Sequence, residues 1–176
     1  MSKSILEELK DIFATCARTY CGYCVYDCPA YKEYGSEAYT SRGKMNLGNY
    51  LIHGLVKESK EMAELYYRCT LCGWCEINCA LNNTSVFTKM RAYFAEQGLE
   101  PKEAQEILSN FRNYGNIFGV PQSNRAKWAE NLDIPRTGDI LLFAGCNYPL
   151  IPGLSDILVK AVEVLRFLGV KVSYLY

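Results

Sequence analysis

The sequence has only one histidine, His53, in 176 residues. This scarcity excludes most zinc-finger patterns that combine cysteine with histidine, and most catalysis that depends on an imidazole base. The chain also has no excess of charge, because 19 Lys and Arg residues balance 19 Asp and Glu residues. Since binding to phosphates needs a basic surplus, we expect no nucleic acid partner.

Long apolar runs are missing too. No stretch approaches the ~18 consecutive apolar residues of a membrane-spanning helix. Residues 1–13 mix Lys and Glu where a signal peptide would be apolar. We therefore expect a cytoplasmic protein with no direct membrane span, attached to a membrane only through a partner. The sequence also lacks a G-x-G-x-x-G motif, so a flavin or nicotinamide would have to be bound by another subunit.

The abundant residue is cysteine. Nine cysteines are present, an odd number, and without a secretion signal we expect them to stay reduced. Reduced cysteine at this density is typical of metal binding. Eight of the nine form two quartets: Cys16, Cys21, Cys24 and Cys28, then Cys69, Cys72, Cys75 and Cys79.

The second quartet has the spacing C-x2-C-x2-C-x3-C, which is the bacterial type of iron–sulfur spacing. Three closely spaced thiolates let the chain loop around one corner of a cubane, and Gly73 permits the tight turn between them. In this pattern the fourth cysteine ligates the other cluster. The spacing therefore predicts two [4Fe–4S] clusters with exchanged ligands. Cluster 1 takes Cys16, Cys21, Cys24 and Cys79, and cluster 2 takes Cys69, Cys72, Cys75 and Cys28.

The first quartet departs from this spacing. It has four residues between Cys16 and Cys21, and Arg18 stands where the usual pattern has a ligand. Either a wider loop lets Cys16 reach the iron, or Cys16 is not a ligand and cluster 1 is a three-iron species. Two structural zinc sites are the other alternative, although zinc usually takes C-x2-C pairs from two separate hairpins.

Helical patterns surround the two quartets. Apolar residues recur at helical spacing over residues 3–15, and Pro29 suits the first turn of a helix after Cys28. Thr84 or Ser85 is the expected cap of the helix after the second quartet. The expected helices cover residues 3–15, 45–56, 58–68, 84–97 and 101–114. Such a helical insertion between the quartets predicts an α-helical di-cluster ferredoxin domain over residues 1–114.

The pattern changes after a Gly-, Pro- and Asn-rich stretch, residues 115–138, which we interpret as a linker with one short helix. Residues 140–144 are expected to form a buried strand, 154–168 a helix, and 170–176 a second, parallel strand. The predicted fold is therefore mainly α, followed by a truncated β-α-β half-module over residues 139–176. Because one helix cannot cover both faces of a parallel sheet, the sequence looks cut short, or else this piece packs on a partner or on the helical domain.

Taken in order, the motifs resemble the heterodisulfide reductase-like iron–sulfur proteins, and the D-like type of that family is the nearest. The motifs are the two quartets, SRGKM at 41–45, FGVPQSNRAKW at 118–128 and LLFAGCNYP at 141–149. Related proteins are the iron–sulfur subunits of glycolate oxidase and of anaerobic glycerol-3-phosphate dehydrogenase. The resemblance implies an α-helical ferredoxin domain followed by cysteine-rich modules with a Cys-Cys-Gly signature. Cys146 matches the first cysteine of such a module, and the Cys-Cys pair would lie beyond residue 176.

The expected function is a one-electron relay through two [4Fe–4S] clusters, to or from a partner oxidoreductase. The partner would be a flavoprotein, a hydrogenase or a membrane cytochrome subunit, and the chain would be an electron-transfer component rather than an enzyme alone. The alternative is a piece of a disulfide- or quinone-reducing catalytic subunit whose active-site module lies beyond residue 176. Cys146 is then a ligand of that module; otherwise it is a small buried turn residue.

Several other side chains have open interpretations. Arg42 and Lys44 could neutralise a reduced cluster, fix a turn by binding backbone carbonyls, or be ordinary solvated loop charges. Trp74 could shield its cluster from water or simply pack in the core. His53 is expected on a helix face or at a cap. We expect four tyrosines to pack around the clusters rather than to act as redox relays: Tyr20, Tyr23, Tyr26 and Tyr31.

Overall fold

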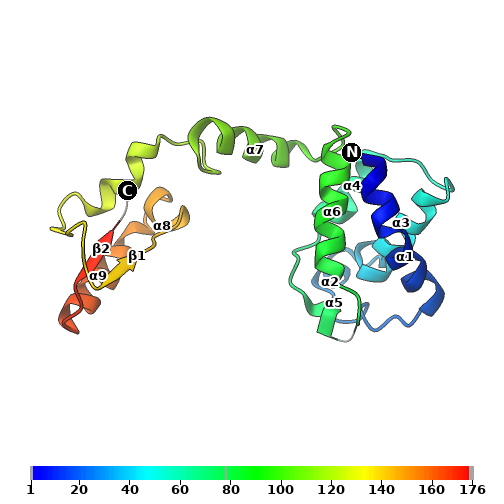
Figure 1. The fold of residues 1–176 in the computed structure, drawn as a ribbon, viewed down its shortest axis with the longest axis horizontal. Helices are drawn as coiled ribbons and strands as arrows, with labels where there is room; N and C mark the ends of the chain where they lie inside the picture. Colours follow the sequence, from blue (N-terminus) through cyan, green and yellow to red (C-terminus); the bar gives the residue numbers. More distant parts are fainter. Residues whose placement is uncertain (1, 78, 175–176) are drawn as a thin grey trace. The chain divides into compact units, whose positions relative to one another are not determined.

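The computed structural model describes residues 2–77 and 79–174. It divides into two compact units, unit 1 (Met1–Lys102) and unit 2 (Glu103–Tyr176), which are described separately (Figure 1). The elements are α1 (Ser2–Thr19), α2 (Pro29–Tyr34), η1 (Glu37–Tyr39), α3 (Ser41–Ile52), α4 (Lys60–Tyr67), α5 (Trp74–Ile77), α6 (Asn83–Ala95), α7 (Lys102–Tyr114), η2 (Gln122–Ala129), β1 (Ile140–Leu142), α8 (Asn147–Leu150), α9 (Ser155–Phe167) and β2 (Val172–Tyr174). The protein is thus mainly helical, as the sequence predicts. The predicted functional boundaries, residues 1–114, 115–138 and 139–176, stay predictions.

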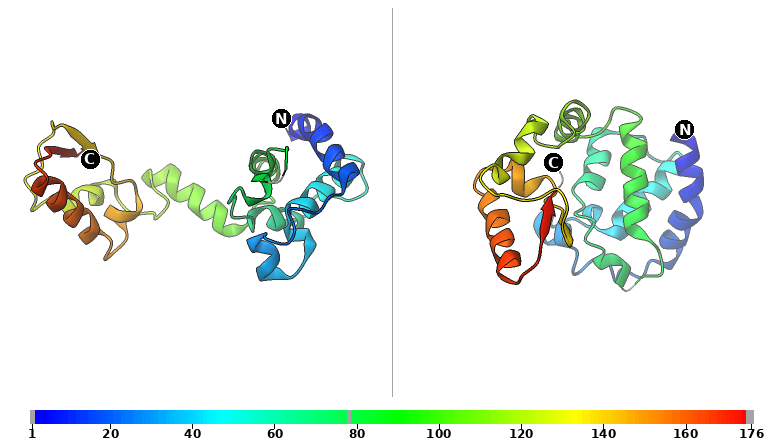
Figure 2. Two further views of the ribbon diagram at one scale, coloured as in Figure 1. Left: turned by 90° about the horizontal axis from the view of Figure 1, so that it is seen from below. Right: turned by 60° about the vertical axis from the view of Figure 1, so that its left-hand side comes forward.

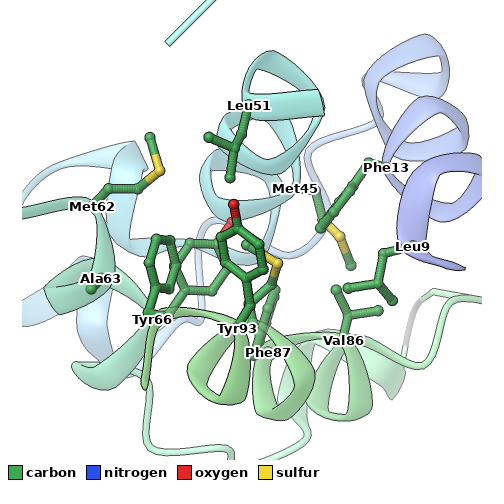
Figure 3. Close-up of a cluster of buried hydrophobic side chains, with 12 residues drawn as sticks. Leu9, Phe13, Met45, Leu51, Met62, Ala63, Tyr66, Val86, Phe87 and Tyr93 are labelled. Carbon is green, nitrogen blue, oxygen red and sulfur yellow. The ribbon is translucent and has the colours of Figure 1, made fainter. Parts of the chain in front are cut away.

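The core of unit 1 lies between helices α1, α3, α4 and α6. Figure 3 shows side chains from these four helices pointing toward one another. Three aromatic rings pack closely at its centre, with the Tyr66 ring 6.0 Å from that of Phe87 and 5.4 Å from that of Phe94. The Tyr66 hydroxyl donates a 2.7 Å hydrogen bond to the Lys44 carbonyl, so its burial leaves no polar atom unpaired. This core fixes α3 against α4 and α6.

Helix α1 is longer than the apolar pattern predicts. Leu9 and Phe13 are almost fully buried on its inner face, as expected for apolar residues one turn apart. The helix continues through Cys16 and ends at Thr19, four residues beyond the predicted end at 15. The Thr15 and Thr19 hydroxyls bond back to carbonyls one turn earlier, which keeps the exposed last turn hydrogen-bonded.

Helix α3 begins at Ser41, not at residue 45 as predicted. Thr40 is its N-cap, and the Thr40 hydroxyl accepts a 3.1 Å hydrogen bond from the backbone N–H of Gly43. The segment that reads as a turn from its composition is therefore the first turn of a helix. The predicted cap of α6 is also wrong, because Asn82 takes that position and accepts a 3.2 Å bond from the Ser85 N–H.

Helices α1 and α3 approach each other closely at Gly48. A Cβ atom at this position would lie 2.5 Å from the far end of the buried Phe13 ring. Only glycine therefore lets the end of the ring come this close to the backbone of α3. The contact fixes how far α1 can slide along α3.

Unit 2 contains a two-stranded parallel sheet with helix α9 between its strands in sequence (Figure 2). The parallel pairing agrees with the predicted β-α-β unit. Strand β2 is buried, but β1 is not the buried strand that the sequence predicts, because Ile140 and Leu141 are about half exposed. The stretch interpreted as a linker contributes Trp128, which packs edge-on against the Tyr174 ring at 4.9 Å.

Among the helices of residues 2–77 and 79–174, none combines the length and apolarity that a membrane crossing requires.

Candidate iron–sulfur site

The two cysteine loops share one backbone conformation. In the first loop Tyr20 and Gly22, on either side of Cys21, have positive φ angles of 49° and 76°. In the second loop Leu71 and Gly73, on either side of Cys72, have φ angles of 53° and 77°. Among the described residues, Tyr20 and Leu71 are the non-glycine residues in this left-handed region, which is costly for L-residues. The loops from Cys21 and from Cys72 are therefore structural equivalents.

The extra two residues of the first quartet lie in helix α1. Cys16 sits inside the last turn of that helix, and its carbonyl accepts a 3.2 Å hydrogen bond from the Tyr20 N–H. Cys69, its counterpart, comes just after helix α4 has ended, and its N–H bonds to the Tyr66 carbonyl at 3.3 Å. The first quartet thus takes up its wider spacing as extra helix, and Cys16 remains beside the loop.

A solvent-open hollow of about 400 Å³ brings cysteines of both quartets together. Its wall includes Cys69, Cys72 and Cys75 from the second quartet, together with Cys24 and Cys28 from the first. Cys28 reaches it as the residue that caps helix α2, where Pro29 takes the first helical position as predicted. We call this hollow the cysteine cavity.

Cys16 belongs to a second group of thiols, which shares Cys24 with the cysteine cavity. Burial is the main cause that raises the pKa of the Cys16 thiol to about 11, and the charges of Cys24, Cys79 and Cys21 add to the rise. These three thiols are the ones that the spacing groups with Cys16. Cys79 is described although its neighbour at position 78 is not, and its sulfur accepts a 3.4 Å hydrogen bond from the Leu81 N–H.

The first turn of helix α3 lies between these two groups of thiols. Burial raises the pKa of the Cys24 thiol, and a hydrogen bond from the Arg42 backbone N–H opposes the rise. Burial also raises the pKa of the Cys75 thiol to about 11, opposed by a hydrogen bond with the Ser41 side chain. A helix N-terminus stabilises negative charge, so this turn favours the thiolate form on both sides.

The two cations of this turn behave differently. Lys44 is 1% exposed and lines the cysteine cavity, where its ammonium donates to the carbonyls of Tyr39 and, at 3.4 Å, Thr40. It therefore binds backbone carbonyls, and the interpretation as a solvated loop charge is wrong. Arg42 forms a 2.5 Å ion pair with Glu37, and its guanidinium lies 4.7 Å from the centre of the Tyr20 ring.

Polar residues that the sequence analysis missed also surround the cavity. Arg91 on α6 donates to the carbonyls of Tyr66, Tyr67 and Cys69, which orders the chain where it enters the second loop. Glu76 accepts 2.6 and 2.8 Å hydrogen bonds from the N–H and hydroxyl of Thr84, at the start of α6. Their partners are backbone groups or distant residues, so no local sequence signal marks them.

The aromatic residues are less buried than expected. Tyr20, Tyr23 and Tyr26 are each more than 60% exposed, so the prediction that they pack around the clusters is wrong for these three. Trp74 lines the cysteine cavity and is 43% exposed, so it covers only part of the opening. His53 is the C-cap of α3, as predicted.

The ninth cysteine lies in unit 2. Cys146 is half-buried and directly precedes helix α8. Its sulfur is 3.1 Å from the Arg125 guanidinium, which also donates a 2.9 Å bond to the Gly145 carbonyl. The two residues come from the two motifs, 118–128 and 141–149, that carry the family resemblance in this half.

The donor set and the cavity fit an iron–sulfur cluster. Across residues 2–77 and 79–174, no three His, Cys, Asp or Glu side chains converge closely enough to hold one metal ion. The cysteine cavity, with thiols on several sides and a buried cation in its wall, has the chemistry that such a cluster requires.

Comparison with known proteins agrees with this class of site. Residues 13–83 match the family described as a 4Fe-4S dicluster domain. The match supports 4Fe–4S clusters as the cofactors of this segment, and two clusters agree with the family description.

One curated relative is the uncharacterized electron transport protein YkgF of Escherichia coli (strain K12). The two sequences are 30% identical over 112 residues, which is 62% of this chain and 23% of the relative. The chain therefore spans about a quarter of the length of this relative. The family match and the name of this relative together support iron–sulfur electron transfer.

Proposed function

We propose that this chain is a heterodisulfide reductase-like electron-transfer protein that relays single electrons through two [4Fe–4S] clusters to or from a partner oxidoreductase. The observation that carries the proposal is the cysteine cavity, where Cys28 from the first quartet lies with Cys69, Cys72 and Cys75 from the second. A cavity that draws thiols from both quartets supports exchanged ligation. When bound, the clusters supply reversible one-electron transfer.

The ligands proposed for the two clusters follow the two environments of the thiols. Cluster 1 is held by Cys16, Cys21, Cys24 and Cys79, a set supported by the charges that act on Cys16. Cluster 2 is held by Cys69, Cys72, Cys75 and Cys28. The protein's own contribution is to bury part of the sulfurs, to direct the first turn of α3 at both sets, and to keep the sets side by side.

The partner and the compartment belong to this proposal. A flavoprotein, a hydrogenase or a membrane cytochrome subunit would exchange electrons with the chain in the cytoplasm. The exposed Cys21 and the exposed rings of Tyr23 and Tyr26 make the first cysteine loop accessible to such a partner.

The first experiment measures iron, acid-labile sulfide and zinc per chain on protein purified without oxygen. The proposal expects about eight irons and about eight sulfides, since each cubane contains four of each. About seven irons would indicate a three-iron cluster 1 without Cys16 as a ligand. Zinc without sulfide would overturn the electron-transfer function altogether.

A second candidate is a catalytic subunit that reduces a disulfide or a quinone, with an active-site module beyond residue 176. The contact between Arg125 and Cys146 favours it, because the guanidinium holds this sulfur in a fixed position just before α8, where the family motif has its first module cysteine. The test is whether the gene encodes a Cys-Cys-Gly string downstream, and whether the full product reduces a disulfide or quinone with a dithionite-reduced donor. Activity that disappears in Cys146→Ser would support this second function.

A further inference from the structure

The buried ammonium of Lys44 has an unusual environment. Lysine is among the residues least often buried, and a buried charge is normally paired with an opposite charge. In the described part of the chain, the ion pairs include no carboxylate partner for Lys44. Its ammonium contacts two carbonyls and lies 5.4 Å from the centre of the Phe87 ring. These contacts satisfy hydrogen bonds but leave a net positive charge inside the protein.

The negative groups nearest to this charge are cysteines. Burial lowers the pKa of Lys44, and the charges of Cys69, Cys28 and Cys75 raise it. All three are ligands of cluster 2 under the proposed function, and Lys44 shares the wall of the cysteine cavity with them. A cluster bound there would be the counter-charge that the buried lysine otherwise lacks.

Cluster 1 has a cation of a different kind. The Arg42 guanidinium packs against Gly22, where an added Cβ would lie 2.7 Å from the guanidinium, so it lies beside the first cysteine loop. However, Arg42 is paired with Glu37, and that carboxylate is 43% exposed. The Arg42 charge still opposes the rise in the pKa of Cys16, but its paired and partly exposed carboxylate, which water screens, offsets part of this charge.

Other charges near cluster 2 do not cancel Lys44. Glu76 acts in the opposite sense because its charge is one of those that raise the pKa of Cys75, but its carboxylate is bound to the first turn of α6. Arg91 adds a second positive charge near Cys69, where it donates to the Cys69 carbonyl. The fixed charge around cluster 2 is therefore more positive than that around cluster 1, where the Glu37 carboxylate is paired with the nearby cation, Arg42.

We infer that the fixed charge of Lys44 holds the reduction potential of cluster 2 above that of cluster 1. Cluster 2 is therefore reduced first. The inference rests on the proposed function. Each cluster accepts one electron from the donor and passes one to the acceptor. Net charge near a cluster is a main determinant of its potential, because a reduced cluster carries one more negative charge.

The test is an anaerobic redox titration followed by electron paramagnetic resonance, with dithionite as the reductant. Wild-type protein should show two midpoints, and Cys72→Ser should alter the spectrum of the cluster with the higher midpoint. Lys44→Gln keeps a hydrogen-bond donor but removes the charge. It should lower the midpoint of cluster 2, so that the ratio of reduced to oxidised cluster 2 at a fixed potential falls at least tenfold. For a one-electron couple, a tenfold change corresponds to a shift of about 59 mV.

Two matched variants separate charge from packing. Lys44→Arg keeps the charge, so cluster 2 should have the wild-type midpoint in this variant. Lys89→Gln removes an exposed lysine of α6 that pairs with Glu8, and it should change neither midpoint. A fall of both midpoints by the same amount in Lys44→Gln, or no fall in a variant that holds full iron, overturns the inference.

A variant beside cluster 1 keeps the inference testable if Lys44→Gln does not fold. Glu37→Gln removes the partly exposed carboxylate that is paired with Arg42 and leaves the charge of Arg42 unpaired. It should therefore raise the midpoint of cluster 1 and narrow the difference between the two midpoints. If the difference between the two midpoints is unchanged in Glu37→Gln, the nearby fixed charges do not set the potentials of the clusters. Iron and sulfide contents near eight each with no such shifts would refute the inference alone, whereas absent clusters would refute the proposed function.

Discussion

Gly43→Ala tests the close packing that gives the first turn of helix α3 its position. A methyl group at position 43 would lie 2.8 Å from Cα of Ala38 and closer still to the Glu37 carbonyl oxygen. Both are backbone atoms of η1, so they cannot rotate away as a side chain could. The backbone on one side of the contact must therefore move.

The magnitude follows from three contributions. Overpacking of this kind costs about 1–3 kcal/mol. The Glu37 carbonyl also accepts hydrogen bonds from the N–H of Thr40 at 2.9 Å and from its hydroxyl at 2.8 Å. Displacing it weakens the Thr40 cap, and losing a cap costs about 1 kcal/mol. Alanine has a helix propensity about 1 kcal/mol more favourable than glycine, which offsets the loss of the cap. The expected net loss of stability is therefore about 1–3 kcal/mol.

The assay is thermal unfolding of the cluster-loaded protein under anaerobic conditions at one scan rate. A loss of this size should lower the melting temperature of unit 1 by about 5–20 °C, since each kcal/mol shifts a domain of this size by about 4–8 °C. Asp11→Ala, on the exposed face of α1, is the control for alanine in a helix and should not lower it. A Gly43→Ala protein that melts at or above the wild-type temperature refutes the packing argument.

Three further outcomes are expected. Cys72→Ser should lose one cluster and melt at a lower temperature, whereas Cys146→Ser should keep full iron; retention of all iron by Cys72→Ser would contradict its role as a ligand. Burial, with the hydrogen bond to Glu58, raises the pKa of Tyr93 to about 12. A raised folded-state pKa gives stability that is complete below the unfolded value of about 10 and is lost above it. The stability gap between wild type and Tyr93→Phe, measured by denaturant titration, should therefore stay constant from pH 7 to about 9 and shrink above about 10; a gap that grows there would reverse the sign. Removing iron with a chelator should expose backbone amides of the two cysteine loops to hydrogen exchange but leave residues 103–174 protected; equal loss in both units would show that they unfold together.

Local features of the site could be predicted from the sequence because they depend on spacing within a few residues. The turn at Gly73 and the helix that starts at Pro29 follow from the positions of the cysteines and from the backbone preferences of glycine and proline. The apolar residues of α1 predict a helix that ends too early. Its last turn, around Cys16, is polar and is hydrogen-bonded by threonine hydroxyls rather than buried.

Features that depend on tertiary contacts could not be predicted in the same way. The carbonyl partners of Lys44 are local, but nothing local marks this residue as buried, since its cover includes the Phe87 ring of a helix more than 40 residues away. The start of α3 is not evident from the sequence because Thr, Ser and Gly are as common in turns as in helix caps. The apolar run of strand β1 predicts burial, but the described residues leave about half of Ile140 uncovered.

The contact between Phe13 and Gly48 has a consequence for the rate of electron transfer. Cys16 follows Phe13 by three residues on α1, which places it about 4.5 Å farther along the helix axis, toward the start of α3. If Cys16 is a ligand of cluster 1, as proposed, sliding of α1 along α3 would change the separation of the two clusters, and electron tunnelling slows steeply as that separation grows. A larger residue at position 48 would push the Phe13 ring away from α3, so the glycine would then help to set the distance over which an electron tunnels between the clusters.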